Sequence, residues 1–232
     1  DRRMEKHLLV GCSFTDPRWQ DAIPWSVHYS KNYQTSYIVA NAGMGWNGIC
    51  TEAYMYAQNL KFDHCVIMLP DMWRMDIELN HEGNTANAMV DLLESDRIII
   101  PAVRKWIISG GLHWNQITTL YSKELKLFDQ LYKYQDFLPI MREHVLKLKL
   151  LLLSLRARNI SYTITAIKDP MHQLEGLDYI KDDIVELLDS VEYKNWLRFD
   201  GKFVDEFVGH VKHPTTEEHT LIGDYIWQNH LT

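Results

Sequence analysis

The sequence predicts a single α/β domain with a mainly parallel sheet, and two features of the chain lead to this prediction. Short apolar runs bounded by turn residues alternate with longer segments whose apolar residues recur at helical spacing. Strands separated by helices need crossover connections, which favour parallel pairing. With 232 residues, 46% of them hydrophobic, the chain can bury one sizeable core, and we see no repeat or linker that would divide it.

Four segments have the composition of buried strands: His7–Val10, Tyr37–Ala40, Cys65–Leu69 and Tyr162–Ile167. Helices are predicted at 25–33, 47–60 and 136–158, and a further amphipathic helix follows the capping box formed by Thr215 and Glu218. We expect Leu221, Ile222, Tyr225 and Ile226 on the apolar side of that last helix. Ligands of parallel sheets bind beyond the carboxyl ends of strands, so the loops after Val10, Ala40, Leu69 and Ile167 are candidates for a site.

Residues from about 78 to 135 break this rhythm with Asn, Gly and His mixed among aromatic-rich pieces. We expect an insertion over the active-site edge, either as a lid or substrate wall or as an excursion that only packs against the domain. The prediction remains one domain over residues 1–232.

Charge and cysteine content exclude several classes of protein. A net charge of −7 disfavours binding to a nucleic acid backbone, which needs clustered Lys and Arg. Cys12, Cys50 and Cys65 form no paired spacing, so we expect neither a disulfide framework nor a zinc site. The longest apolar run, Leu150–Leu153, is far shorter than the roughly 20 residues of a membrane span. We expect a cytoplasmic protein without membrane segment or secretion signal.

Ser13 is the first candidate for chemistry. The segment Gly11-Cys12-Ser13-Phe14-Thr15 places a serine just past the first predicted strand, where its hydroxyl would face the ligand-binding edge and its N–H a developing oxyanion. The alternative interpretation is a Ser/Thr turn that begins the next element.

His213 is the second candidate, because it lies in the loop immediately before the last predicted helix. A histidine held next to a firmly capped helix suits a general base. A His-Pro pair before a helix is also a common surface turn.

Together the two ends of the chain resemble the SGNH/GDSL hydrolase family. Gly11-Cys12-Ser13-Phe14-Thr15 looks like the Gly-Asp-Ser-x-Thr opening block of that family, and His213-Pro214 resembles the closing block before its last helix. The resemblance covers residues from about 7 to 231. It implies a flavodoxin-like three-layer α/β/α sandwich with Ser13 as nucleophile and His213 as base. Cys12 replaces the usual Asp, and we interpret it as a small buried residue.

Two further blocks of the family can be compared. After the second strand, Gly43 matches the glycine whose N–H donates to the oxyanion, or it serves a plain strand-to-helix turn. Asn47 could assist the oxyanion, but we favour it as the N-cap of the next helix. After the third strand the family usually has Gly-x-Asn, whereas this chain has Leu69 and Asp71.

Asp71 is the main departure from the family, because an ionised carboxylate repels an oxyanion. Either Asp71 has another role, such as fixing Arg74, or the oxyanion hole consists of the Ser13 and Gly43 amides, with or without Asn47. Arg74 could bind a substrate carboxylate, although we favour pairing with Asp71 or Asp76.

The triad acid is a second departure. The family's acid usually lies three residues before the base, and that position here is His210. Asp205 or Asp200 could orient His213 from a shifted loop, with Asp205 preferred, or a backbone carbonyl could orient it in a Ser–His dyad.

Two functions remain open. The first, which we favour, is a serine-dependent hydrolase of small acyl esters, with O-acetylated carbohydrate as the first substrate class to try. The second is a protein with an SGNH fold and a degraded site that has a binding or structural role, for example as a phage virion component. The resemblance suggests this because similar Gly-Cys-Ser-Phe-Thr proteins occur in bacteriophages and in surface-polysaccharide gene clusters. The resemblance thus adds virion association to the expected locations.

No cofactor is expected. The first strand is not followed by a GxGxxG or GxxxxGK[ST] motif, so a nucleotide-binding function is not supported. His210, His213 and His219 have no carboxylate partner in a metal-binding spacing, and we expect no metal there.

Overall fold

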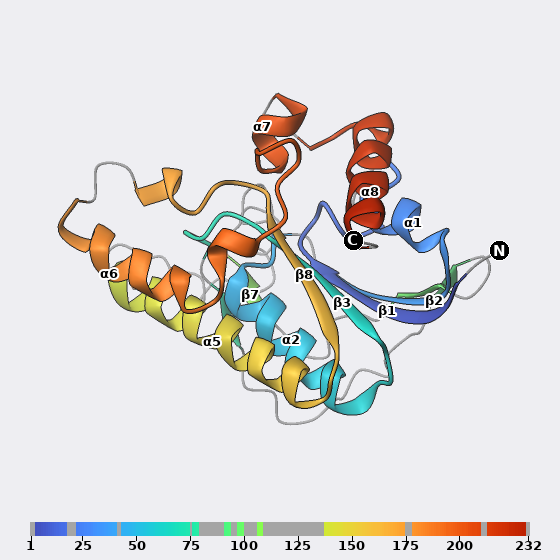
Figure 1. Cartoon of the computed structure of the whole chain (residues 1–232), viewed down its shortest axis with the longest axis horizontal. Helices are drawn as coiled ribbons and strands as arrows, with labels where there is room; N and C mark the ends of the chain where they lie inside the picture. Colours follow the sequence, from blue (N-terminus) through green and yellow to red (C-terminus); the bar gives the residue numbers. More distant parts are fainter. Residues whose placement is uncertain are drawn as a thin grey trace.

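A computed structural model describes residues 3–17, 22–40, 43–74, 76–78, 91–93, 97–99, 106–108, 137–174, 178–209 and 213–230. A central sheet is covered on both faces by helices, which makes a three-layer α/β/α sandwich (Figure 1). The predicted flavodoxin-like fold class is confirmed.

The central sheet has the order β5-β6-β2-β1-β3-β8. Its strands are β1 (Arg3–Gly11), β2 (Tyr33–Ala40), β3 (His64–Leu69), β5 (Asp91–Leu93), β6 (Arg97–Ile99) and β8 (Ser161–Ala166). Every neighbouring pair is parallel except β5 with β6. The order β2-β1-β3-β8 contains all four strands predicted from the sequence, and β1 lies where the chain direction across the sheet reverses.

The predicted insertion contributes strands as well as connections. β5 and β6 extend the main sheet beyond β2, which the sequence analysis did not anticipate. β4 (Asp76–Glu78) and β7 (Trp106–Ile108) form a separate antiparallel pair. The other residues between 79 and 135 lie outside the described part of the chain, and so does the expectation that they cover the active-site edge.

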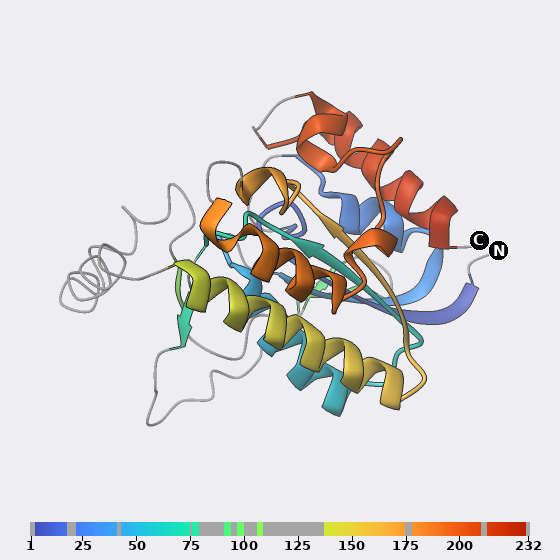
Figure 2. The same ribbon diagram turned by 60° about the vertical axis from the view of Figure 1, so that its left-hand side comes forward.

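Two pairs of helices cover the sheet. α1 (Trp25–Ser30) packs beside α8 (Thr216–His230) on one face, and α2 (Trp46–Asn59) packs beside α5 (Phe137–Ala157) on the other (Figures 1 and 2). α6 (Asp178–Asp189) lies against α5, and α7 (Val204–Val208) precedes α8. Short 3-10 turns, η1 (His172–Leu174) and η2 (Tyr193–Asn195), flank α6. α6 and α7 were not predicted from the sequence.

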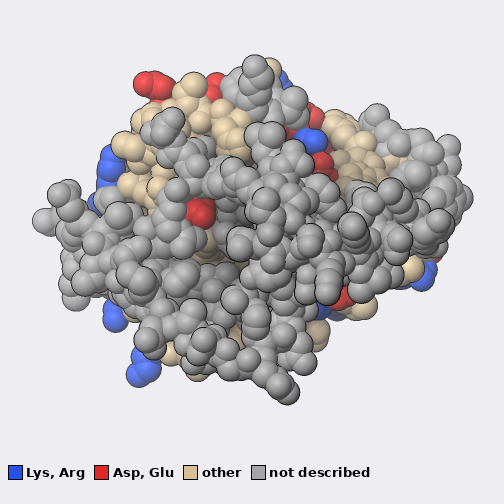
Figure 3. Space-filling model, turned by 180° about the vertical axis from the view of Figure 1, so that it is seen from behind, with Lys and Arg blue, Asp and Glu red and all other residues tan. Residues whose placement is uncertain are grey.

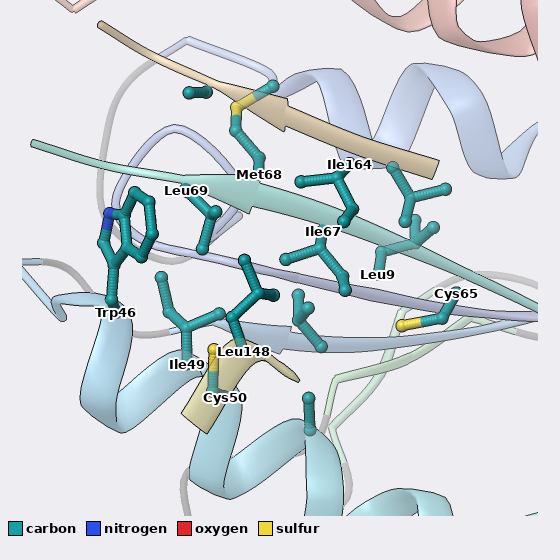
Figure 4. Close-up of a cluster of buried hydrophobic side chains, with 14 of the residues drawn as sticks. Leu9, Trp46, Ile49, Cys50, Cys65, Ile67, Met68, Leu69, Leu148 and Ile164 are labelled. Carbon is teal, nitrogen blue, oxygen red and sulfur yellow. The ribbon is translucent and has the colours of Figure 1, made fainter. Parts of the chain in front are cut away.

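The core includes buried side chains on both faces of the sheet, and a large part of it lies between β3 and the α2–α5 pair. Every residue of β3 is buried, because both faces of the strand are covered, and this explains its unbroken apolar run. Figure 4 shows Ile49 and Leu148 pointing from the two helices toward Ile67 and Leu69. The three cysteines are buried and free, as expected. Burial raises the pKa of Cys50 to about 12, so this thiol stays protonated.

Charge on the described surface is mixed. On the side opposite to the view of Figure 1, described acidic and basic side chains are scattered around the rim (Figure 3). Among the helices with described residues, none has the length and apolar character needed to cross a membrane.

Gly223 sets the distance between α1 and α8. A Cβ atom at this position would lie 2.9 Å from the carbonyl oxygen of Trp25 and 3.0 Å from Cβ of His28. The backbones of the two helices therefore approach each other at a point where only glycine fits. The exposed side of α8 begins next to this point: Leu221, which we expected on the apolar side, is 58% exposed, whereas Ile222 and Ile226 are fully buried.

We predict that Gly223→Ala lowers the free energy of unfolding by about 1–2 kcal/mol, because the added methyl group pushes α8 away from α1. In an exposed helical position the same change would stabilise by about 1 kcal/mol through helix propensity, so the sign of the effect is diagnostic. Chemical denaturation measures the change. Leu221→Ala is the control, expected within about 0.5 kcal/mol of the parent. Unchanged or increased stability of Gly223→Ala would contradict the close contact.

Candidate active site

Ser13 lies in a tight turn immediately after β1. The N–H groups of Thr15 and Asp16 both donate to the carbonyl of Cys12, at 2.9 and 3.1 Å. Gly11 makes this turn possible, because a Cβ atom there would lie only 2.0 Å from Oγ1 of Thr15. The spacing Gly-x-Ser-x-Thr thus has a physical cause: the glycine leaves room for the threonine to fold back over the end of the strand.

The turn is at the reversal point of the sheet. From β1 the chain continues to β2 on one side, and it then crosses to β3 on the other side of β1. The loops after β1 and β3 diverge at such a point, and ligands of open parallel sheets bind in the resulting crevice. Ser13 lies at this edge with 4% of its surface exposed.

His213 comes within reach of Ser13 although 200 residues separate them. Its Nε2 atom lies 3.4 Å from Oγ of Ser13, and its ring centre lies 4.8 Å from that of Phe14. Catalytic hydrogen bonds of this length commonly shorten when substrate binds. His213 is exposed, whereas Pro214 after it is buried. The geometry thus brings together the two residues that the sequence predicted as nucleophile and base.

The predicted capping box holds the chain just after His213. The N–H of Thr215 donates to Oε2 of Glu218 at 2.7 Å, and the N–H of Glu218 donates to Oγ1 of Thr215 at 3.3 Å. Both ends of this reciprocal pair satisfy amides that the first turn of α8 would otherwise leave open. The backbone next to His213 is therefore fixed on the carboxyl side.

Trp25 joins the turn of Ser13 to the start of α8. Its indole N–H donates to Oγ1 of Thr15 at 3.1 Å, and its backbone N–H donates to Nδ1 of His219 at 3.3 Å. The hydroxyl of Ser26 adds a bond to the Thr15 carbonyl at 2.7 Å. Burial and the neighbouring His213 together lower the pKa of His219 to about 4, so His219 is neutral near pH 7 and can accept a hydrogen bond from the N–H of Trp25.

The segment that follows β2 is arranged differently from the prediction. Gly43 has φ of +81°, a left-handed conformation that favours glycine. Asn47 is not the N-cap of α2; that position is Gly45, which has no side chain to cap with. Asn47 lies inside the first turn and donates from Nδ2 to the backbone carbonyl of Asp76 at 2.9 Å. Its amide nitrogen is thus engaged with the protein.

Asp76 replaces the missing cap of α2, a role that the sequence analysis did not assign to it. Its Oδ2 atom accepts the N–H of Gly45 at 2.7 Å and the N–H of Gly48 at 2.9 Å. The carboxylate can approach this closely because residue 48 is glycine. A Cβ atom at that position would lie only 2.9 Å from the same oxygen. A carboxylate at a helix N-terminus is stabilised by the helix dipole. No local sequence motif predicts this cap, because Asp76 lies 28 residues after Gly48.

Asp71 pairs with a lysine that the sequence analysis did not consider. Its Oδ2 atom lies 3.1 Å from Nζ of Lys168, and its Oδ1 atom accepts the N–H of Trp73 at 3.0 Å. The described contacts show no pair between Asp71 and Arg74, which was one of the two pairings considered for Arg74. The charge of Arg74 instead acts on Asp76, the other partner considered for it. With both oxygens engaged and a cation beside it, Asp71 is not a bare negative charge at the edge of the sheet.

The described contacts place neither candidate acid on His213. Asp205 begins α7, where its Oδ1 atom accepts the N–H of Glu206 at 2.9 Å, and burial raises the pKa of its carboxyl group. Asp200 is exposed in a turn, and its N–H donates to the hydroxyl of Tyr225 at 3.0 Å. Residues 210–212 lie outside the described part of the chain. The described contacts bring Ser13 and His213 together.

Comparison of the chain with models of known protein families found no match, and comparison with curated proteins found none either. Function is therefore inferred from the residues and geometry of the site itself.

The Asp76 carboxyl group should make stability depend on pH. Burial raises its pKa to about 7, against the lowering effects of the Gly48 and Gly45 amides and of Arg74. Unfolded chains release this proton near pH 4. Between about pH 4 and 7 the folded chain therefore holds a proton that the unfolded chain has lost, and this contribution to the free energy of unfolding falls as pH rises.

We predict that Asp76→Asn removes this component of the pH dependence. Both backbone bonds go to one oxygen, so the asparagine oxygen can keep them. Denaturation across pH 4–8 should show a smaller decrease of stability with rising pH for Asp76→Asn than for the parent. Asp76→Ala, which loses both acceptor bonds, should be less stable at every pH. Equal slopes for the parent and Asp76→Asn would show that Asp76 is ionised throughout.

Proposed function

We propose that this protein is a serine-dependent ester hydrolase of the SGNH type, with Ser13 as nucleophile and His213 as general base. The observation that carries the proposal is the 3.4 Å distance between Oγ of Ser13 and Nε2 of His213 at the carboxyl edge of a parallel sheet. Residues so far apart in the sequence come within reach of each other through two separate loops. Geometry of this kind is the first requirement for a nucleophile and its base.

The proposed reaction has two displacements. Oγ of Ser13 forms a bond to the ester carbonyl carbon as its proton passes to Nε2 of His213, and the bond to the alcohol oxygen then breaks as that proton passes to the leaving alcohol. Water then bonds to the acyl carbon as its proton passes to Nε2 of His213, and the bond to Oγ of Ser13 breaks as that proton passes to Oγ, which releases the acid. Backbone N–H groups of Ser13 and Gly43 are the proposed oxyanion donors.

The arrangement around Asp71 supports this assignment. In the SGNH family, which the chain resembles, an asparagine in this loop donates to the oxyanion. An uncompensated carboxylate in the same place would oppose catalysis. Lys168 offsets that charge at 3.1 Å. We propose that the hole works with backbone donors only, and that Asp71 and Lys168 line the substrate side of the crevice.

Small acyl esters are the proposed substrates, with O-acetyl groups of carbohydrates as the first class to test. The resemblance implies this class. The low exposure of Ser13, 4%, fits a small acyl group better than a long one.

A fluorophosphonate probe tests the nucleophile without knowledge of the substrate. We expect intact-mass analysis to show one probe adduct on the parent, none on Ser13→Ala, and labelling slowed by about 100-fold or more for His213→Ala, because general-base catalysis contributes roughly 10²–10⁴. Ser190→Ala and His172→Ala, which change an exposed serine and an exposed histidine, are matched controls and should label like the parent.

Absence of labelling on the folded parent, or undiminished labelling of Ser13→Ala, would overturn the proposal. That result would favour a binding or structural role for the fold, the alternative considered in the sequence analysis. With a labelled parent, release of acetate from acetylated sugars would then separate the proposed substrate class from other small esters.

A further inference from the structure

A second cluster of polar residues lies at the opposite end of β1 from Ser13. Glu5 and His7 are two residues apart on the strand, so their side chains lie on the same face of the sheet. That face is covered by α1 and α8, and the last residue of α8, His230, reaches the pair. The Oε2 atom of Glu5 lies 3.5 Å from Nε2 of His7 and 3.8 Å from Nε2 of His230.

We propose that Glu5, His7 and His230 form a binding site for a divalent transition-metal ion, with Zn²⁺ the best match. Their three donor atoms all lie within 4.8 Å of one another. Ligands of a tetrahedral zinc ion with bonds of about 2.0–2.1 Å are separated by about 3.4 Å, so small side-chain adjustments bring the three atoms to bonding distance. Two imidazoles and one carboxylate are donors that zinc accepts, with a fourth position left for water.

The surroundings of His7 orient its ring for such a role. Its Nδ1 atom lies 2.8 Å from the hydroxyl of Tyr29, and its ring stacks on Tyr33 with centres 3.7 Å apart. When Nδ1 donates to the Tyr29 oxygen, the lone pair of Nε2 points toward Glu5. A hydrogen bond from the other ring nitrogen is what fixes the tautomer and orientation of metal-binding histidines.

His64 completes the cluster as a support, not as a ligand. Its two ring nitrogens are engaged by Oγ of Ser161 at 2.7 Å and Oγ1 of Thr163 at 3.0 Å. Its ring centre lies 3.8 Å from that of His230, which holds the His230 ring in place.

The charge balance of the cluster also favours a cation. Glu5 has one buried oxygen, Oε2, that accepts no hydrogen bond from the described residues. A divalent ion supplies the positive charge and bonds to all three groups at once. Its effect would be to tie the last turn of α8 to β1.

Zinc binding by untagged protein, stripped with a chelator, tests the proposal. We expect calorimetry to show one Zn²⁺ per chain and the melting temperature to rise with Zn²⁺ concentration, because the ion binds the folded state. Glu5→Gln and His230→Gln should each weaken binding at least tenfold. Co²⁺ should give a visible absorption band with the parent, and the two variants should lose it.

His172→Ala provides a matched control, because it removes a surface His–Glu pair whose Nδ1 and Oε1 atoms are 3.0 Å apart. It should bind Zn²⁺ like the parent. No binding by the folded parent, or equal binding by the parent, Glu5→Gln and His230→Gln, would overturn the proposal. If one variant fails to fold, as judged by circular dichroism, the other decides. Labelling of Ser13 by the fluorophosphonate probe is independent of either result.

Discussion

The Trp25 hydrogen bonds are the constraint on which the candidate site depends. One side chain and one amide of the same buried residue hold the turn that carries Ser13 and the helix that follows His213. In the part of the chain that the structure describes, no strand pairing joins the two loops. Their relative position is therefore set through α1. The close packing of Gly223 against the same stretch of α1 keeps α8 at the distance that these bonds require. The geometry of the candidate site therefore depends on the α1–α8 pair as much as on the two loops.

The two ends of β1 carry two different proposed sites. At its carboxyl end the strand stops at a glycine, the chain turns, and Ser13 meets an exposed histidine. At its amino end Glu5 and His7 face a histidine from the other end of α8. Both proposed sites thus use β1 and α8, and a cation at one end would stabilise the helix whose first residues follow His213. The two proposals remain separable, because the nucleophile and the metal ligands share no residue.

Much of this architecture was predictable because it follows from short sequence patterns, such as apolar runs and residue spacings within a few positions. All four predicted strands are present, and the box of Thr215 and Glu218 forms as the spacing of the two residues indicates. The position of Ser13 followed from a strand ending in glycine. What the sequence did not reveal were partners from distant segments: Lys168 for Asp71, and Asp76 for the amides of α2. A carboxylate recruited from another strand has no characteristic spacing, so propensity favoured Asn47 as the cap, and tertiary structure placed Gly45 there instead.

The cap of α2 has a consequence for how sequences of this type can vary. Gly45 and Gly48 are needed for the close approach of a carboxylate, and the Asp76 carboxylate is needed because Gly45 has no side chain with which to cap the helix. If the acid at position 76 is lost, the two glycines no longer need to leave room for it, and if the glycines are lost, the acid can no longer cap the helix. We therefore expect positions 45, 48 and 76 to vary together in related chains, where a serine, threonine or aspartate at position 45 should accompany replacement of the acid at position 76.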